Sequence, residues 1–384
     1  MDAYLLDWLT LLARWAHIVV GIAWIGASFY FIWLDNHLEA GTSSEFSGEL
    51  HAIHGGGFYQ VQKYKLAPAE LPATLHWFKW EAYWTWITGF TMLVLVYYLR
   101  PELYLIDASV RALSPGAAIG IGLGSLIAGL VVYEALCRSP LGESGLAVAL
   151  LVVFGFAAWG LTQVFSGRGA FIHFGAILGS IMAANVAHII IPGQRELVRA
   201  KQEGREPDPK YALAGKQRSV HNTYFTLPVI FTMMSGHHAM TYGHRWNWLV
   251  LIAMALAGAL IRLWFVARHK GTPPVWTLVA GLFVVGVVMV MLSPRLETPT
   301  QAVRFTEVKQ VIEQRCLVCH AEKPAFPGIA EAPKGFKLDT PERIQAQQPL
   351  IYQQAVLTRA MPPGNITQMT DEERALLDRW VRIK

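Results

Sequence analysis

The sequence predicts an all-α membrane protein, a bundle of eight transmembrane helices followed by a small all-α domain outside the membrane. Three observations support this fold class. Of the 384 residues, 53% are hydrophobic and 15% are charged, whereas an ordinary soluble domain carries about 25% charged residues. Eight windows are apolar over about 20 residues, the length needed to cross a hydrocarbon core. Residues 304–384 contain no such window and have seven prolines.

The eight expected spans divide the chain into domains. They cover residues 8–34, 80–99, 116–136, 145–165, 170–191, 220–240, 246–267 and 275–292. We therefore expect a membrane domain over residues 1–292, a linker over 293–303 and a separate domain over 304–384. In that last domain a helix is expected over Asp371–Trp380, with Thr370 and Glu373 as its capping box.

Positive charges predict the topology. Loops 35–79, 137–143, 192–219 and 268–273 together hold 13 Lys and Arg, whereas the alternate set of loops holds five. The positive-inside rule places the first set in the cytoplasm. Both termini and the C-terminal domain are then outside, which in a bacterium means a multi-pass inner-membrane protein with periplasmic termini. The small, evenly spread excess of basic residues argues against a nucleic acid as partner.

The strongest motif is Cys316-Leu317-Val318-Cys319-His320, a CxxCH sequence. This spacing is the attachment signature of haem c, in which the two thiols bind the haem covalently and the histidine ligates the iron. A zinc knuckle would need a second pair of ligands, and none follows. We therefore predict one haem c, held by Cys316 and Cys319 with His320 on the iron, in a class I cytochrome c domain.

The sixth iron ligand is expected on a loop that returns from the far side of the haem. Met361, in the sequence Arg359-Ala360-Met361-Pro362-Pro363, fits this position best. Ligation by Met and His raises the potential and makes the domain an electron acceptor. Met369 is the alternative, although a core methionine is the better interpretation of it. Phe305 and Trp380 are expected to pack together.

Histidines in the predicted spans form two tiers. A histidine within a span is costly and indicates function. We consider them as ligands of one or two b-type haems: His17, His173, His237 and His238 toward the periplasm, and His76, His188 and His221 toward the cytoplasm. The alternative, that these imidazoles form hydrogen bonds between helices or line a polar cavity, is equally open.

A glycine run in the first cytoplasmic loop is a candidate substrate site. In His54-Gly55-Gly56-Gly57-Phe58-Tyr59, backbone N–H groups of Gly55, Gly56 and Gly57 can converge on an anion, and His54 can move a proton at neutral pH. Tyr59 offers an aromatic face. A plain turn is the simpler interpretation of such a run.

The segment from His76 to Trp86 carries four tryptophans at the expected membrane entrance. Most of it fits the aromatic belt that anchors a span at the headgroups. The functional interpretation is a flat pocket for a planar ligand, with Trp84 as a face and Lys79 and Glu81 as polar groups. Arg14, Glu134 and Arg262 can form ion pairs or extend their charged groups toward the membrane surface, and we favour the second.

Together these segments resemble the bacterial membrane-bound, cytochrome c-linked urate oxidases, also called urate hydroxylases. The resemblance depends on Arg14-Trp15-Ala16-His17 with residues 21–31, on residues 54–59 and on residues 75–83, and it extends through the spans to the CxxCH motif. It implies oxidation of urate to 5-hydroxyisourate in purine degradation, with water as the oxygen source. It also implies that electrons leave through haem c to a respiratory-chain cytochrome c or terminal oxidase.

From these interpretations we expect urate to bind at the cytoplasmic side, where His54 or Glu81 activates water. The alternative function is a non-catalytic membrane-anchored cytochrome subunit that relays electrons from a quinol or a partner dehydrogenase. A transporter with a redox sensor domain is disfavoured, because the two four-span halves show no internal repeat.

Overall fold

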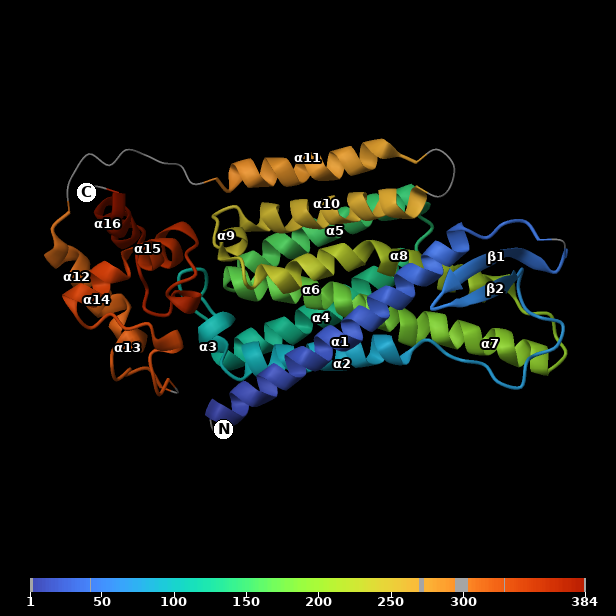
Figure 1. Ribbon diagram of the computed structural model, residues 1–384, viewed down its shortest axis with the longest axis horizontal. Helices are drawn as coiled ribbons and strands as arrows, with labels where there is room; N and C mark the ends of the chain where they lie inside the picture. The colour runs from blue at the N-terminus through green and yellow to red at the C-terminus, as the bar shows by residue number, and fades with distance from the viewer. Residues whose placement is uncertain (1–2, 42, 269–272, 294–302, 328, 383–384) are drawn as a thin grey trace.

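The computed structural model describes residues 3–41, 43–268, 273–293, 303–327 and 329–382. Long helices lie side by side in one bundle, and the C-terminal domain sits at one end of it (Figure 1). The expected spans correspond to helices α1 Ala3–Asn36, α2 Trp80–Leu93 with η1 Val94–Tyr98, α4 Pro115–Cys137, α5 Glu143–Thr162, α6 Gly167–Ala184 with η2 Asn185–Ile190, α8 Pro209–Ser235, α10 Asn247–Ala267 and α11 Val275–Met291.

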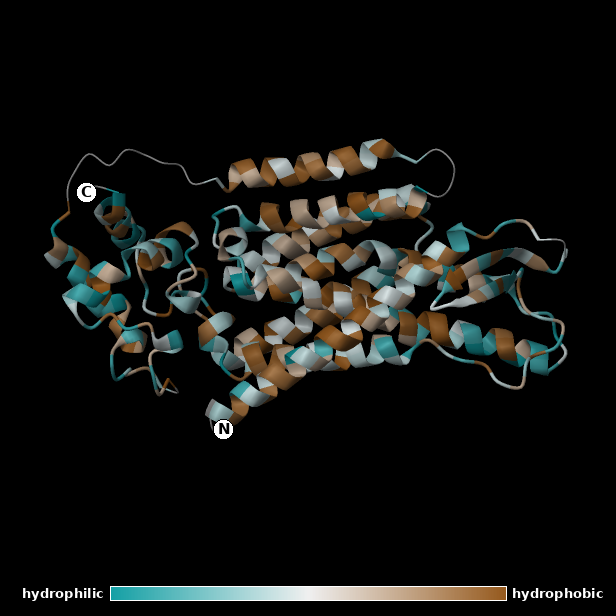
Figure 2. Ribbon diagram, viewed as in Figure 1, coloured by the Kyte–Doolittle hydropathy of each residue, from teal (hydrophilic) through white to brown (hydrophobic). Residues whose placement is uncertain are grey.

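Five of these segments are long and apolar enough to cross a membrane by length and composition, namely Tyr4–Asn36, Pro115–Cys137, Glu143–Thr162, Gly167–Gln202 and Asn247–Ala267. Helix α11 is apolar but shorter, at 17 residues. Hydrophobic residues cover the bundle, whereas the C-terminal domain is mixed (Figure 2). This supports a membrane protein, and the count of eight spans stays a prediction.

The core of the bundle forms around α6, which contacts α2, α4, α5 and α8. Phe165, Phe171 and Phe174 lie in and just before this helix and are at most 1% exposed. Small residues allow the close approach of neighbours, because a β-carbon at Gly129 would lie 2.5 Å from Ile177. Helix α6 therefore holds its side chains in fixed positions relative to four other elements.

The first predicted cytoplasmic loop contradicts the all-α expectation. Strands β1 Phe46–His54 and β2 Gly57–Tyr64 form an antiparallel hairpin. Gly55 and Gly56 have φ angles of 57° and 84°, the left-handed values that a two-residue hairpin turn requires. Apolar and polar residues do not alternate strictly along residues 46–54, so the sequence did not reveal this strand.

The C-terminal domain has its own hydrophobic core, with Val308, Ile312, Leu338, Ile344 and Leu377 at its centre. Its helices are α12 Phe305–Arg315, α13 Leu317–His320, η3 Pro333–Gly335, α14 Pro341–Ala346, α15 Gln348–Ile351, η4 Tyr352–Leu357, η5 Pro363–Asn365 and α16 Asp371–Arg382. Thr370 and Glu373 form the predicted capping box of α16. Phe305 and Trp380 pack with ring centroids 6.2 Å apart, as expected.

Three short helices complete the chain: α3 Pro101–Tyr104, α7 Ile191–Gln202 and α9 Ala239–Tyr242. Helix α7 continues α6 and η2 beyond the bundle (Figure 1). Helix α3 and the residues after it, 101–107, form a turn between η1 and α4 that faces the C-terminal domain (Figure 1). We call residues 101–107 the docking turn.

Candidate functional site

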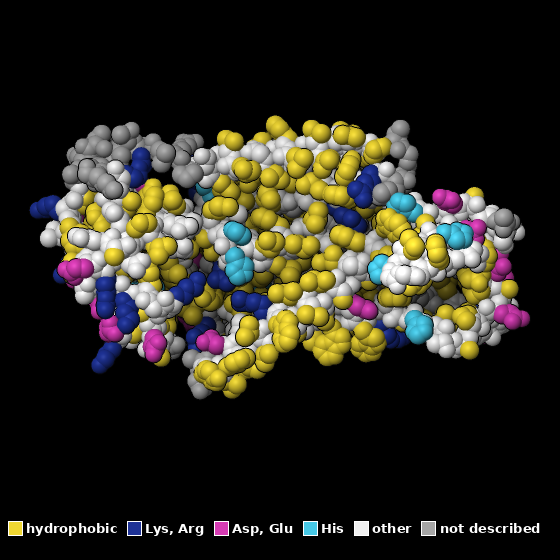
Figure 3. Space-filling model, in the orientation of Figure 1, with side chains coloured by type: hydrophobic (Ala, Val, Ile, Leu, Met, Phe, Trp, Pro, Cys, Tyr) yellow, Lys and Arg dark blue, Asp and Glu magenta, His cyan; other side chains and the backbone are white. Residues whose placement is uncertain are grey.

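A cavity of about 370 Å³ lies between α1, α2, α6 and α8. Its volume lies within the range of roughly 300–1,000 Å³ that is usual for ligand sites. The ionisable lining residues are Arg14, His17, Arg168 and His237. Arg14 lies in the first half of α1, Arg168 in the first turn of α6, and His237 just after α8. These positions lie toward the end of the bundle that carries the C-terminal domain, where Figure 3 shows basic and histidine side chains gathered.

The two arginines give the cavity a positive charge. No ion pair among the described residues includes Arg14 or Arg168. Arg168 is held by aromatic groups instead: its Nε donates to Tyr97 Oη at 3.2 Å, and its Cζ lies 4.2 Å from the ring centroid of Tyr104. A cation in a membrane cavity without a carboxylate partner favours an anionic ligand.

His17 is oriented so that one ring nitrogen is available as a base. Its Nδ1 lies 3.0 Å from Thr88 Oγ1, and that hydroxyl donates to the backbone oxygen of Trp84 at 2.6 Å. Because the hydroxyl hydrogen is used, Nδ1 of His17 carries the proton and donates, which leaves the lone pair on Nε2. Gly89 makes room for this ring, since a β-carbon there would lie 2.9 Å from its Cε1.

The cavity walls suit a flat ligand. Trp86 and Phe90 stack at 5.4 Å with an interplanar angle of 14°, and Trp86 Nε1 donates to Ser180 Oγ at 3.0 Å, which fixes the indole. Gly21 and Gly179 also line the cavity, and a β-carbon at either position would meet no atom within 4 Å. The absent side chains of these glycines are therefore part of the free space.

The C-terminal domain contacts the same end of the bundle through the loop 358–365, which contains Met361. A β-carbon at Gly364 would lie 2.7 Å from the backbone oxygen of Ile106, in the docking turn. On the other side of the loop, a β-carbon at Gly243 would lie 2.5 Å from the backbone oxygen of Thr358. Two glycines thus allow backbone-to-backbone contact between the two domains.

The CxxCH motif is arranged as haem c attachment requires. Cys316 ends α12, and Cys319 and His320 lie on the single turn of α13, none of whose residues is buried. Nδ1 of His320 lies 2.7 Å from the backbone oxygen of Phe336 and must donate to it, so Nε2 is available to iron. Two partly exposed thiols beside such an imidazole fit haem c.

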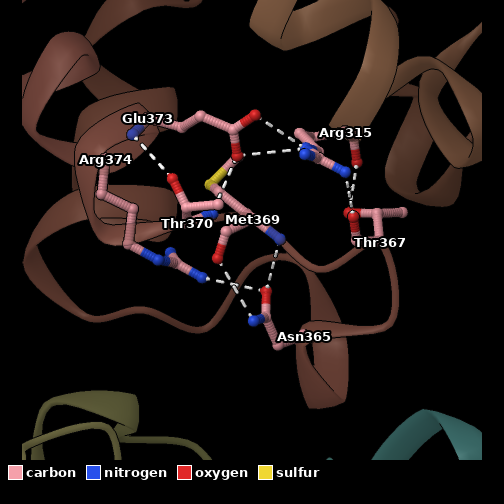
Figure 4. A network of polar contacts seen from close by, with 7 residues as sticks. All are labelled: Arg315, Asn365, Thr367, Met369, Thr370, Glu373 and Arg374. Atoms are coloured by element: carbon pink, nitrogen blue, oxygen red, sulfur yellow. Dashed lines mark hydrogen bonds and ion pairs between the residues drawn. The ribbon is translucent and has the colours of Figure 1, made fainter. Parts of the chain in front are cut away.

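The two methionines have different environments. Met369 is 3% exposed in the core of the C-terminal domain, whereas Met361 is half-buried on its loop. Arg374 holds that loop, because its Nη1 donates to the backbone oxygens of Met361 and Ala355. Asn365 joins the loop to the same network, which Figure 4 shows. Met361 stays the predicted sixth ligand, because Met369 is packed in the core.

His173 is held by two hydrogen bonds. Its Nδ1 donates to the backbone oxygen of Gly169 at 2.8 Å, and its Nε2 accepts from Tyr98 Oη at 2.9 Å. The ring is fully buried and stacks on Phe165 at 4.8 Å. Both nitrogens therefore form hydrogen bonds, which favours the alternative of interhelical hydrogen bonds for His173, and ligation of iron by this residue stays a prediction.

The other candidate histidines have different surroundings. Nδ1 of His221 lies 2.8 Å from Tyr133 Oη, and Asn185 Nδ2 donates to the same hydroxyl. His17 and His237 line the cavity. The remaining three candidates are exposed: His76, His188 and His238.

The predicted cytoplasmic substrate site is not assembled as expected. Residues 54–57 form the hairpin turn, and Tyr59 is 54% exposed. Lys79 lies over the ring of Trp80 at 5.2 Å, Trp84 is 51% exposed and Glu81 is half-buried. Within the described ranges, no hydrogen bond, ion pair or ring contact joins the turn to Lys79, Glu81 or Trp84, and none of these residues lines the cavity.

Sequence reasoning missed the arginines of the cavity. Arg14 was expected to reach the membrane surface, and Arg168 was counted only as a loop charge. A usable signal was present, because both arginines occur near the predicted periplasmic ends of spans without an acidic residue one helical turn away. Glu134 also differs from expectation, since it pairs with Arg138 and with the buried Arg218.

Comparison with known proteins gives one result for the membrane domain. The family model described as urate oxidase N-terminal matches residues 3–293. Searches of curated proteins and of solved structures found no match. The matched range includes the whole bundle and the cavity, and it ends before the CxxCH domain. The chain therefore belongs to the urate oxidase N-terminal family, which connects it with the oxidation of urate.

Proposed function

We propose that the protein is a membrane-bound urate oxidase that binds urate in the cavity and passes its electrons to haem c in the C-terminal domain. One observation carries the proposal: Arg14 and Arg168 line a cavity at the end of the bundle to which the C-terminal domain is docked, and neither has a carboxylate partner among the described residues. Urate is a planar anion at neutral pH. The aromatic walls and the two guanidinium groups match its shape and charge.

The reaction must add water and remove two electrons. Urate and water give 5-hydroxyisourate, two protons and two electrons, and the new bond joins the water oxygen to C5 of the ring. Nε2 of His17 is the base that takes a proton from this water, because its lone pair is available. Guanidinium groups on either side of the anion keep it in place while its charge changes.

The C-terminal domain receives the electrons. Haem c, when bound by Cys316, Cys319, His320 and Met361, supplies one-electron chemistry at a raised potential. The domain itself holds the His320 imidazole through Phe336 and the Met361 loop through Arg374. The final acceptor is a respiratory-chain cytochrome c or terminal oxidase. His173 is not used as a haem ligand in this proposal, because both of its ring nitrogens form hydrogen bonds.

The proposed location is the bacterial inner membrane, with eight spans in the lipid bilayer and both termini in the periplasm. Charge counts in the loops support this orientation. The cavity then lies toward the periplasmic end. This replaces the earlier expectation of a cytoplasmic urate site at His54, Lys79 and Glu81.

Anaerobic mixing of the purified holoprotein with urate tests the proposal. We expect urate to reduce haem c without any added partner, and Arg14→Gln or Arg168→Gln to weaken urate binding at least 100-fold. Arg111→Gln is the matched control, because Arg111 is exposed at the same end and lies outside the cavity. Reduction by a quinol but not by urate supports the electron-relay alternative instead.

A further inference from the structure

The docking turn contacts the Met361 loop and also Arg168, a residue that lines the cavity. On the bundle side its backbone is attached to the start of α6: Ser166 Oγ donates to the backbone oxygen of Tyr104 at 2.6 Å, and Ser166 N donates to that of Leu105 at 2.9 Å. Leu105 is fully buried. The turn is therefore fixed to the helix that carries Arg168.

Side chains reinforce this attachment next to the cavity. The ring of Tyr104 lies under the Arg168 guanidinium at 4.2 Å, and it contacts the ring of Tyr97 edge-on at 6.2 Å. Tyr97 also accepts a hydrogen bond from Arg168. The cation–π contact attracts the guanidinium to the ring, so a displacement of Arg168 displaces Tyr104 as well.

On the opposite side the turn supports the C-terminal domain. A β-carbon at Gly364 would lie 2.7 Å from the backbone oxygen of Ile106 and 3.2 Å from those of Glu102 and Leu103. Gly364 is three residues after Met361, and Arg374 ties both ends of this short segment together through Met361 and Asn365. A shift of the turn is thus transmitted to the loop that carries the sixth ligand.

We infer that the docking turn couples anion binding in the cavity to the reduction potential of the C-terminal haem, with Tyr104 as the positioning residue. This inference rests on the proposed function, because it needs the anion to bind at Arg168. We expect haem oxidation and anion binding at Arg168 to favour the same position of the docking turn, so the oxidised protein has the higher affinity. By linkage, binding lowers the potential by the same free energy. Substrate is then bound preferentially when the acceptor can take an electron.

Xanthine, a planar purine that ionises near neutral pH and lacks the C8 oxygen, serves as the probe. Its dissociation constant is measured for oxidised and reduced full-length holoprotein, and the haem midpoint is titrated with and without saturating xanthine. We expect at least tenfold tighter binding to the oxidised protein, which lowers the one-electron midpoint by about 59 mV. Tyr104→Phe keeps the ring over Arg168 and should keep this shift.

Two variants uncouple the sites from opposite sides of the turn. Tyr104→Leu removes the ring, and Gly364→Ala pushes the loop away from the three backbone oxygens. Both should bind xanthine with equal affinity in the two redox states, whatever their absolute affinity. Since the readout is the difference caused by xanthine, an altered absolute potential in Gly364→Ala does not affect it. Tyr211→Leu, at the start of α8, is the control that should keep the shift.

The outcomes separate the two proposals. Xanthine binding without a shift of potential in the wild type overturns the coupling and leaves the cavity site in place. A shift that persists in Tyr104→Leu and Gly364→Ala also overturns the coupling, because a through-space effect then explains it. Failure of xanthine and urate to bind, or binding that Arg168→Gln leaves unchanged, overturns both proposals.

Discussion

Nη1 of Arg374 donates to the backbone oxygen of Met361 at 2.9 Å, from a side chain that is 6% exposed. Burial lowers the pKa of Arg374 to about 10, so the group is still charged at neutral pH. Its hydrogen-bond acceptors in the described structure are the backbone oxygens of Ala355 and Met361 and the amide oxygen of Asn365. A buried charge is thus used to shape the loop of the predicted sixth ligand.

Replacing this arginine should release the loop. Arg374→Gln loses the charged hydrogen bonds to Met361 and Ala355, and we expect the C-terminal domain to lose about 2–3 kcal/mol of stability. The far-red absorption band of Met-ligated ferric haem should weaken in the same variant. Arg379→Gln, on the same helix and half-exposed, should leave both quantities unchanged. An unaltered band in Arg374→Gln contradicts this role.

The two methionines should behave differently. Met361→Ala is expected to remove the sixth ligand and lower the haem potential, with little loss of stability. Met369→Ala leaves a cavity in a packed core and should cost about 2–5 kcal/mol while the far-red band persists. Redox titration and chemical denaturation of each variant measure the two effects. Loss of the band in Met369→Leu would identify Met369 as the ligand.

Filling the cavity should block urate without unfolding the protein. Gly179→Leu places a side chain in the space that a β-carbon there would enter freely, so urate binding should fall at least 100-fold. Gly120→Leu is the matched control, because Gly120 is exposed on α4 and also has free space at the β-carbon. Isothermal titration of both variants with urate gives the comparison, and equal affinities would place the site elsewhere.

Haem content should be one c-type haem per chain. Pyridine haemochrome spectra distinguish c-type from b-type haem. We expect only the c-type signal, because both ring nitrogens of His173 form hydrogen bonds. Tyr98→Phe leaves His173 Nε2 without its donor and should destabilise the bundle by about 1–3 kcal/mol with an unchanged haem spectrum. A b-type signal lost on His173→Ala would restore the haem interpretation.

Acid should weaken the C-terminal domain near the haem motif. Hydrogen bonds from Lys337 and Arg343 lower the pKa of Glu322, and a hydrogen bond from Arg343 lowers that of Asp339. A lowered carboxylate pKa stabilises the folded domain above the ordinary pKa near 4, and this contribution is lost as the pH falls through the folded pKa. Acid titration followed by absorbance measures this loss. The stability of the wild type should fall more steeply with decreasing pH than the stability of Glu322→Gln.

Local patterns were sufficient for the helices and for the haem motif. Apolar length located most bundle helices to within about five residues, although α8 begins at Pro209, well before the expected residue 220. The spacing of Cys316, Cys319 and His320 places all three beside one helical turn. The capping box at Thr370 was predictable for the same reason, since its two hydrogen bonds join residues three positions apart.

The cavity depends on contacts between distant segments and could not be predicted in this way. Arg14 and Arg168 are 154 positions apart in the chain, and only the packing of α1 against its neighbours brings them to one space. The hairpin was predicted in part. For the glycine run next to His54 the simpler interpretation, a plain turn, is the one the structure shows at Gly55 and Gly56, whereas the strands on either side of it were not predicted.

The contacts at Gly364 and Gly243 are few, yet the domain that makes them belongs to the same polypeptide as the bundle. A short connection keeps such a partner at an effective concentration in the millimolar range, so a weak interface is sufficient to keep it seated. Under the proposed function, electron delivery across this interface should be a first-order process, and its rate should be the same however far the solubilised protein is diluted.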